Sequence, residues 1–342
     1  MKRMYKFLAI LLTMALILPG IAGVVFAAPS ESAVKRLGGT NRVKTSIAVS
    51  QEAYKSAGSV ILAGTGGEID ALTGTLLASD KDAPLLLVDT ANIKEVNAEI
   101  KRLGATKAYI IGGPLAVSED LEAAIDVDTE RIAGGNRYST AAAVAKKFSG
   151  PINGAFIVNG ETALIDALLI GPVAKSLGMP ILLTKKDEVP EDTLDAIEKL
   201  GIKDITIIGG PLAVSEKVKT VLGADRVSGI NRYETALAVA RKYLANSKGA
   251  VIANGEGFVD ADGVKSYADA LVGGYLAALE GAPVLLVDPK EVPATTKTYI
   301  EANVDGAYVL GGELVVGDDL FEDIKEAVET VEGLEVASVS AI

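Results

Sequence analysis

Short apolar runs alternate with longer amphipathic segments along most of this chain. Segments 140–148, 165–176 and 191–200 have the residue spacing of helices, and the runs GAFIVNG, PILLTK and DITIIGG lie beside them. These runs are short and apolar on both faces, which is typical of parallel strands covered by helices on either side. The pattern therefore predicts an α/β fold, a small doubly wound parallel sheet with right-handed crossovers.

Four motifs of this unit occur three times, always in the same order. The first reads RLGGTNRVKT, RIAGGNRYST and RVSGINRYET; it begins at Arg36, Arg131 and Arg226, a spacing of 95 residues in both cases (131 − 36 and 226 − 131). The others are IDAL, IDAL and ADAL, the runs PLLLVD, PILLTK and PVLLVD, and the turns GGPLAV, GGPLAV and GGELVV. The chain is therefore expected to be a tandem of three related units.

The repeats also predict where the units begin and end. The expected boundaries are 34–130, 131–225 and 226–330 for the three units and 331–342 for a C-terminal tail. The third unit carries an extra stretch, GEGFVDADGVKSY, which we expect to be a loop insertion. Because cyclic packing satisfies every equivalent interface at once, we expect three doubly wound parallel sheets around a pseudo-threefold axis.

The first residues have the pattern of a secretory signal peptide. Basic residues at positions 2, 3 and 6 precede an apolar run at 7–18, and small residues follow before Ala28. We expect cleavage that removes residues 1–27, although an uncleaved membrane anchor is the alternative. The mature chain should then be exported, at the cell wall or cell surface, without membrane contact.

Composition excludes several kinds of chemistry. The chain has no His and no Cys, which removes the imidazole base, the thiolate nucleophile, disulfides and the His/Cys ligands of zinc sites. Its 33 Lys and Arg against 45 Asp and Glu give a net charge of −12, which argues against nucleic-acid binding. No G-x-G-x-x-G opens a helix, no P-loop occurs, and each repeat supplies only one recurring Asp. We expect neither an enzyme nor a cofactor or metal, with calcium in the insertion left open.

The NR-x-x-T segments, the GGP turns and the P-x-LL runs resemble the cell wall binding repeat type 2 family of Gram-positive surface proteins. The resemblance covers about residues 34–330. It implies three Rossmann-like domains that hold a secreted protein on the wall non-covalently by binding an anionic polymer, either a polysaccharide or a teichoic-acid-like chain. It also implies an anchor without an effector domain. The alternatives are a surface-layer component that assembles laterally and an accessory module of a wall-remodelling amidase system.

Arginines of the first motif are the strongest candidates for polymer contact. Arg42, Arg137 and Arg232 stand beside predicted helix starts, where a guanidinium fork and the helix dipole would both favour an anion. The complete candidate set is Arg36, Asn41, Arg42, Arg131, Asn136, Arg137, Tyr138, Arg226, Asn231, Arg232 and Tyr233. The Asn residues also have the character of helix caps. Val43 replaces the Tyr of the other repeats, and Glu313 replaces Pro114 and Pro211.

The repeated aspartates have two possible roles. Asp70, Asp166 and Asp269 lie near the first turn of a later helix, where each could pair with a motif Arg of its own or of a neighbouring unit. An ion pair therefore competes with a polymer site. The Gly-rich turns present a similar choice, since their amides could receive an anion or their glycines could simply permit positive φ.

The net charge opposes an anionic partner. Without residues 1–27, which hold three positive charges and no acid, the chain carries 30 − 45 = −15. Local clusters can still favour binding, because salt screens distant charges over about 8 Å. Residues 32–51 contain Lys35, Arg36, Arg42 and Lys44 and no acid, whereas many acids lie at 191–198 and 322–329. If the basic motifs face one surface, binding becomes possible despite the negative net charge.

Overall fold

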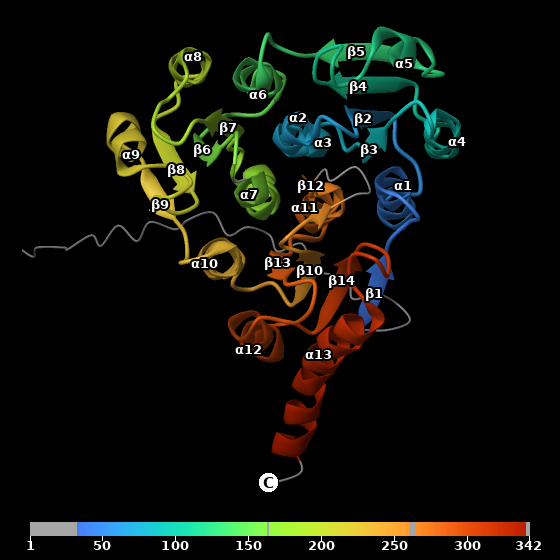
Figure 1. Ribbon diagram of the computed structural model, residues 1–342, viewed down its shortest axis with the longest axis vertical. Coiled ribbons are helices and arrows are strands. Elements are labelled where there is room, and N and C mark those ends of the chain that lie inside the picture. The colour runs from blue at the N-terminus through green and yellow to red at the C-terminus, as the bar shows by residue number, and fades with distance from the viewer. Residues whose placement is uncertain (1–32, 163, 260–264, 340–342) are drawn as a thin grey trace, which may run out of the picture.

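The computed structural model describes residues 33–162, 164–259 and 265–339 (Figure 1). The predicted signal peptide at residues 1–27 lies outside these ranges and stays a prediction. None of the helices in the described part of the chain combines the length and apolar character that a bilayer crossing requires.

Three parallel four-stranded sheets form the frame of the molecule. The first contains β2 (Ser59–Gly64), β3 (Leu85–Val88), β4 (Lys107–Ile111) and β5 (Asp128–Ile132); the second contains β6 (Gly154–Asn159), β7 (Ile181–Thr184), β8 (Asp204–Ile208) and β9 (Asp225–Val227). The third contains β1 (Val34–Leu37), β10 (Gly249–Asn254), β13 (Val284–Val287) and β14 (Gly306–Leu310). Strands such as β3, β7 and β13 are buried at every residue, which explains their continuous apolar sequences.

Helices connect and cover these strands. The first unit has α1 (Arg42–Ala53), α2 (Glu68–Thr73), α3 (Thr75–Asp80), α4 (Ile93–Leu103) and α5 (Glu119–Ala123), and the second has α6 (Arg137–Ala145), α7 (Leu164–Leu177), α8 (Glu191–Lys199) and α9 (Glu216–Leu222). The third has α10 (Arg232–Tyr243), α11 (Ala268–Glu280), α12 (Ala294–Asn303) and α13 (Asp318–Val339). The predicted insertion contains a short antiparallel pair, β11 (Phe258–Val259) with β12 (Lys265–Ser266).

One helical segment from each unit lies at the centre of the ring (Figure 1). The segment α2–α3, helix α7 and helix α11 pack against one another there. Small residues allow the close approach, since a Cβ at Gly171 would lie 3.3 Å from Thr75 Cγ2 and one at Gly274 only 3.0 Å from the Leu168 carbonyl oxygen. The three parallel-sheet units therefore surround a pseudo-threefold axis, and this prediction is confirmed.

The opening strand of each sequence repeat belongs to the sheet of the preceding repeat. Strand β5 contains Arg131 and pairs with β4, and β9 contains Arg226 and pairs with β8. Strand β1 contains Arg36 and pairs with β14, which joins the first repeat to the third and closes the ring. The repeat boundaries at 130/131 and 225/226 thus fall inside strands. The sequence repeats give the length of one unit, but they do not show at which strand each sheet begins.

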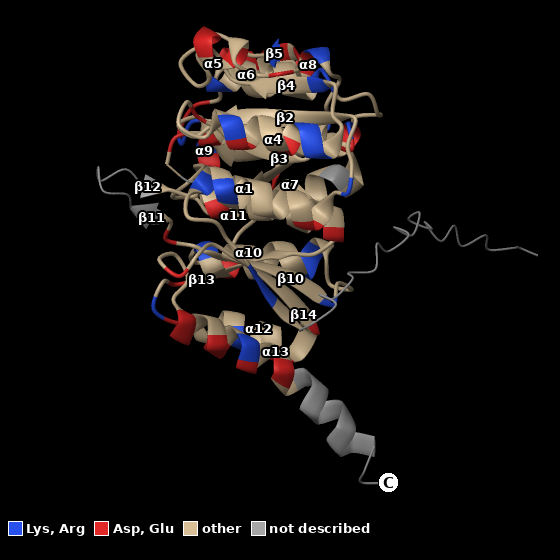
Figure 2. Ribbon diagram, turned by 90° about the vertical axis from the view of Figure 1, so that its right-hand side faces the viewer, with Lys and Arg blue, Asp and Glu red and all other residues tan. Residues whose placement is uncertain are grey.

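Charge is unevenly distributed over this frame. Figure 2 shows acidic residues in red along the coloured part of α13, which lies at the outside of the ring. Helix α8 begins with Glu191 and Asp192. The first turn of α1 contains no acid. Much of the negative charge therefore lies on outer helices, away from the helix starts that carry the NR motif.

Candidate functional site

The carboxyl ends of the strands form the candidate site. In the sheet order β3-β2-β4-β5, β2 and β4 are neighbours, but the chain continues from β2 to β3 on one side and from β4 to β5 on the other. Ligands of doubly wound sheets bind at such a switch point. The turn after β4 begins with Gly112 at φ 107°, and Gly209 and Gly311 have φ of 107° and 105° after β8 and β14. Only glycine adopts this backbone readily, so the first glycine of each pair has the predicted conformational role.

The Asn residues of the NR motif cap the helices that follow. The side-chain oxygens of Asn41, Asn136 and Asn231 accept backbone N–H groups at the starts of α1, α6 and α10. The amide nitrogens of Asn41 and Asn136 donate to Asn92 and Asp192. Their expected role as caps is confirmed, and their contact with a polymer stays a prediction.

The strand arginines are occupied within the fold. Arg131 donates to the carbonyl oxygens of Gly112 and Val117, at 2.8 Å each, and to the Glu122 carboxylate at 2.5 Å. Arg36 makes the same set with Gly311, Val316 and Asp318, and Arg226 with Gly209, Val214 and Glu216. These contacts hold the GG turns against the edge strands. Arg36, Arg131 and Arg226 therefore have a structural role, and their contact with a polymer stays a prediction.

The helix-start arginines have different surroundings. Each donates to the carbonyl oxygen that follows the first strand of its unit: Arg42 to Thr65 at 3.2 Å, Arg137 to Gly160 at 2.5 Å and Arg232 to Gly255 at 2.6 Å. Arg42 also lies 3.7 Å from Glu68, and Arg232 lies 3.5 Å from Glu256. Arg137 is exposed, and no carboxylate of the described residues lies within 4.0 Å of its guanidinium. Of the three helix-start arginines, it is therefore the one whose charge is least neutralised.

The tyrosines that follow two of these arginines are bound inside their own units. Tyr138 donates to Glu161 and Tyr233 to Glu256. Tyr138 is 9% exposed, and Val43, which replaces it in the first unit, is fully buried. Tyr138 therefore packs into the core and Tyr233 packs against it while partly exposed, and contact of either ring with a polymer stays a prediction.

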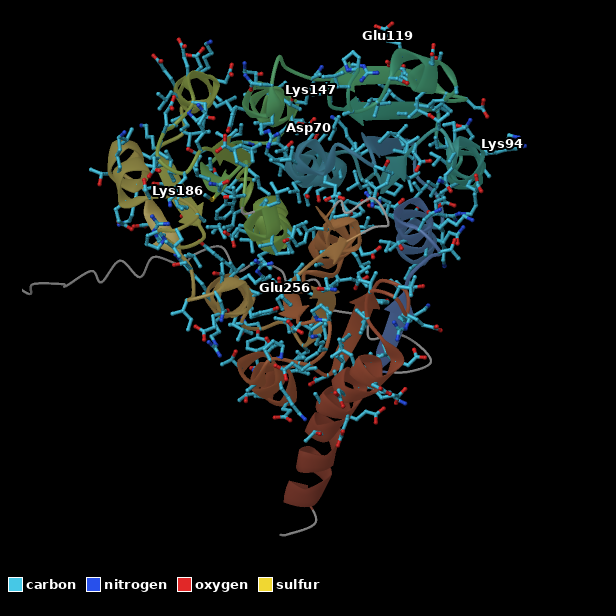
Figure 3. The ribbon with its side chains drawn as sticks, viewed as in Figure 1. Asp70, Lys94, Glu119, Lys147, Lys186 and Glu256 are labelled. Carbon is cyan, nitrogen blue, oxygen red and sulfur yellow. The ribbon has the colours of Figure 1, made fainter. Side chains whose placement is uncertain are left out.

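Each repeated aspartate faces the next unit around the ring. Asp70, Asp166 and Asp269 occupy the first turns of α2, α7 and α11, as predicted. Burial raises the pKa of each carboxyl, to about 7 for Asp166, and a helix-start arginine of the following unit opposes the shift. The partners are Arg137 for Asp70, Arg232 for Asp166 and Arg42 for Asp269. Figure 3 shows Asp70 between α2 and α6, which belong to different units.

These aspartates and arginines do not form contact ion pairs. Within the described residues, no arginine nitrogen lies within 4.0 Å of the three carboxylates. The Oδ1 atoms of Asp70 and Asp269 are buried without a hydrogen-bond partner. Each Asp thus faces an arginine of the neighbouring unit, not of its own, and the two charges interact across a gap without direct contact.

Grooves occupy two of these gaps. A groove of about 360 Å³ between the first two units is lined by Asp70, Arg137, Asn136, Pro114 and Leu115 among others. A groove of about 740 Å³ between the third and first units includes Asp269, Arg42, Glu313 and Leu314. No group of three or more acidic side chains in the described part of the chain is arranged to hold a metal ion.

An exposed leucine marks the equivalent turn of every unit. Leu115 is fully exposed, and Leu212 and Leu314 are 86% and 87% exposed. Sequence reasoning missed these residues, although the signal was present as an apolar residue repeated in the turns GGPL, GGPL and GGEL. A leucine at the lip of a groove offers an apolar surface to a bound molecule.

Comparisons with known proteins identify this arrangement. The chain matches the family described as Cell wall binding domain 2 (CWB2) at residues 36–122, 131–219 and 226–321. It is 30% identical to N-acetylmuramoyl-L-alanine amidase LytC of Bacillus subtilis over 315 residues, and 31% identical to the amidase enhancer of the same organism over 280 residues. These alignments include 90% and 80% of this chain.

Solved structures agree with the sequence matches. Cwp6 and Cwp8 from Clostridium difficile superpose with TM-scores of 0.77 and 0.76 at 28% and 29% identity, each over 88% of this chain. The chain spans 61% and 37% of the lengths of the two Bacillus proteins, and 48% and 52% of the two Clostridium chains. The similarity therefore concerns one part of each of these larger proteins.

Proposed function

Since the chain belongs to the Cell wall binding domain 2 family, we propose that it attaches non-covalently to an anionic cell-wall polymer through the grooves between its units, without catalysis. The polymer would be an anionic polysaccharide or a teichoic-acid-like chain. The signal-peptide pattern at residues 1–27 supports export to the wall. The matched amidase and amidase enhancer support a role beside wall-remodelling enzymes.

The environment of Arg137 carries this proposal. Its guanidinium lines the groove between the first two units, is exposed, and uses one hydrogen bond to the Gly160 carbonyl. The remaining N–H groups can hold a phosphate or carboxylate in a bidentate fork. Leu115 lies at the same groove and supplies an apolar contact for the polymer backbone.

Cyclic symmetry supports binding at several sites. The grooves are built from the carboxyl ends of parallel strands, and pseudo-threefold packing brings these ends to one face of the ring. A long repeating polymer that engages two or more grooves would bind with an affinity on the order of a hundredfold or more above that of a single groove, because the second contact benefits from a high effective concentration. The negative net charge is compatible with this because many acids lie on outer helices.

The charge environment distinguishes Arg137 from Arg42. Arg137→Gln should weaken binding to purified wall polymer by about tenfold or more, the scale of one lost charge-assisted contact. Arg42→Gln should have a smaller effect because Glu68 already neutralises Arg42 in part. The loss in Arg137→Gln should shrink as salt rises. Sedimentation of full-length variants with isolated walls measures both effects.

Lys94 supplies a matched control for this series. It is exposed at the outer rim of the first unit (Figure 3), so Lys94→Gln removes one positive charge away from the grooves. Binding by Lys94→Gln should equal that of the unaltered chain. A loss in Lys94→Gln as large as that in Arg137→Gln would refute a specific site and indicate adsorption by overall charge.

A further inference from the structure

The groove between the first two units contains one acidic and one basic side chain. Asp70 of the first unit and Arg137 of the second both line it, and every other residue of the lining is uncharged. The guanidinium of Arg137 donates to the Gly160 carbonyl oxygen, and no carboxylate of the described residues lies within 4.0 Å of it. An anion that enters this groove therefore meets the carboxyl group of Asp70 as well as the guanidinium.

The carboxyl group of Asp70 receives no hydrogen bond from the part of the chain that the structure describes. Its Oδ1 atom is buried without a partner. Its Oδ2 atom lies against the turn after β4, since a Cβ added to Gly112 would come within 2.9 Å of it. An ionised carboxylate at such a place loses hydration and gains no hydrogen bond in return, whereas the neutral acid loses much less. The surroundings of Asp70 therefore favour its protonated form.

Arg137 supplies the charge that opposes this preference. Helices α3, α6, α7 and α11 and strands β2 and β7 pack against α2. The described ionisable side chains of these elements and of α2 itself are Glu68, Asp80, Arg137, Tyr138, Asp166, Asp269, Tyr275 and Glu280. Burial raises the pKa of Asp70 above its ordinary 3.8, and the positive charge of Arg137 lowers it. The charge state of Asp70 therefore depends on whether Arg137 is free to support the carboxylate.

We propose that the polymer anion at Arg137 binds together with a proton on Asp70, so that attachment to the wall tightens as the surroundings become acidic. This inference rests on the proposed function, because it concerns the same groove and the same guanidinium. A bound anion takes up the positive charge that supports the ionised Asp70 and adds a negative charge beside it. Asp70 then takes a proton from the solvent, and no other bond forms or breaks.

Linkage between the two equilibria fixes the sign of the effect. If the anion raises the affinity of Asp70 for a proton, protonation of Asp70 raises the affinity for the anion by the same factor. Burial already raises the pKa of Asp70 in the free chain, and the anion raises it further. The gain in affinity therefore begins as pH falls through the pKa of Asp70 in the complex, and it is complete below the pKa in the free chain.

The other two junctions contain an additional acid beside the arginine. Arg232 lies 3.5 Å from Glu256, and Arg42 lies 3.7 Å from Glu68. These carboxylates stay beside their arginines whichever form the buried aspartate of the junction adopts. A proton on that aspartate therefore releases less positive charge than a proton on Asp70. We assign the pH dependence to the groove between the first two units for this reason.

Retention on purified wall sacculi at pH 7.5 and pH 5.5 tests the proposal. The unaltered chain should bind about tenfold more tightly at the lower pH, on the order expected for one linked proton. Asp70→Asn keeps the shape of the side chain without its charge. This variant should bind at pH 7.5 about as tightly as the unaltered chain does at pH 5.5, and its affinity should change little with pH. Equal affinities of the variant and the unaltered chain at pH 7.5 would overturn the proposal.

Two further variants separate a local effect from a change in overall charge. Glu119→Gln removes an exposed acid at the outer rim (Figure 3), and it should keep the pH dependence of the unaltered chain. Asp70→Asn should add no affinity when Arg137→Gln is already present, because the proton acts through that guanidinium. An equal gain from Asp70→Asn with and without Arg137 would contradict the proposal.

Proton uptake gives a measurement that needs no variant. Titration calorimetry of the acid-extracted wall polymer into the unaltered chain, in two buffers of different ionisation enthalpy, should show that binding near pH 6.5 takes up protons. Binding without proton uptake would refute the inference and leave the proposed function standing, and so would retention that depends on Arg137 but not on Asp70. No retention of the unaltered chain at either pH would refute both.

Discussion

Gly209→Ala is expected to destabilise the fold by about 2 to 6 kcal/mol, among the largest effects of any single methyl group in this chain. Gly209 has φ 107°, a backbone conformation that costs a side-chain-bearing residue roughly 1–3 kcal/mol. A Cβ atom there would also lie 2.2 Å from Asp166 Oδ2, so the turn or the central helix α7 would have to move. Such overpacking costs about 1–3 kcal/mol more.

Urea unfolding of Gly209→Ala beside Gly210→Ala measures this effect. Gly210 is the matched control, because the nearest atom to its added Cβ would be the Gly229 oxygen at 3.9 Å and its φ is not in the left-handed region. The control should retain nearly full stability. Similar free energies of unfolding for the two variants would show that the turn after β8 is not held against Asp166 as described.

Asp166→Asn should stabilise the protein above neutral pH, by roughly 3–5 kcal/mol. Burial raises the pKa of Asp166 to about 7 from an ordinary 3.8, and Arg232 offsets only part of the shift. The folded state therefore binds a proton more tightly than the unfolded chain. This contribution to stability is fully present below pH 3.8 and is lost as pH rises to about 7. Asparagine keeps the shape without the cost of a buried charge.

Thermal melts at acid and alkaline pH test the sign of this effect. The difference in melting temperature between Asp166→Asn and the unaltered chain should be positive above pH 7 and should decline as pH falls toward 4. Asp187→Asn, in an exposed loop, should melt like the unaltered chain at every pH. Destabilisation by Asp166→Asn at alkaline pH would mean that the ionised carboxylate makes a net favourable pair with Arg232.

Local features of this fold follow directly from the sequence. The runs GAFIVNG, PILLTK and DITIIGG, expected to be strands, form β6, β7 and β8. The Asn caps and the positive φ of Gly112 were also predictable. Each depends on a few neighbouring residues, such as an Asn before a helix or a glycine after a buried strand, so a short window of sequence contains the information.

Features that depend on the closure of the ring were not predictable in the same way. Arg36 and Arg42 lie six residues apart in the same motif, and both seemed suited to an anion. Only the pairing of β1 with β14, from the far end of the chain, places Arg36 on the Gly311 and Val316 carbonyls. The sequence likewise left open whether each Asp faces its own unit or a neighbour, because that choice depends on how units dock.

Sedimentation of the chain without residues 1–27 together with purified wall sacculi tests the central claim most directly. The sacculi are compared before and after acid extraction of their secondary polymers, with Arg137→Gln run in parallel. Polymer binding at the grooves predicts strong retention before extraction, little after it, and reduced retention of Arg137→Gln on the untreated walls. Equal retention of the unaltered chain on both preparations would contradict the account and assign the binding to peptidoglycan itself.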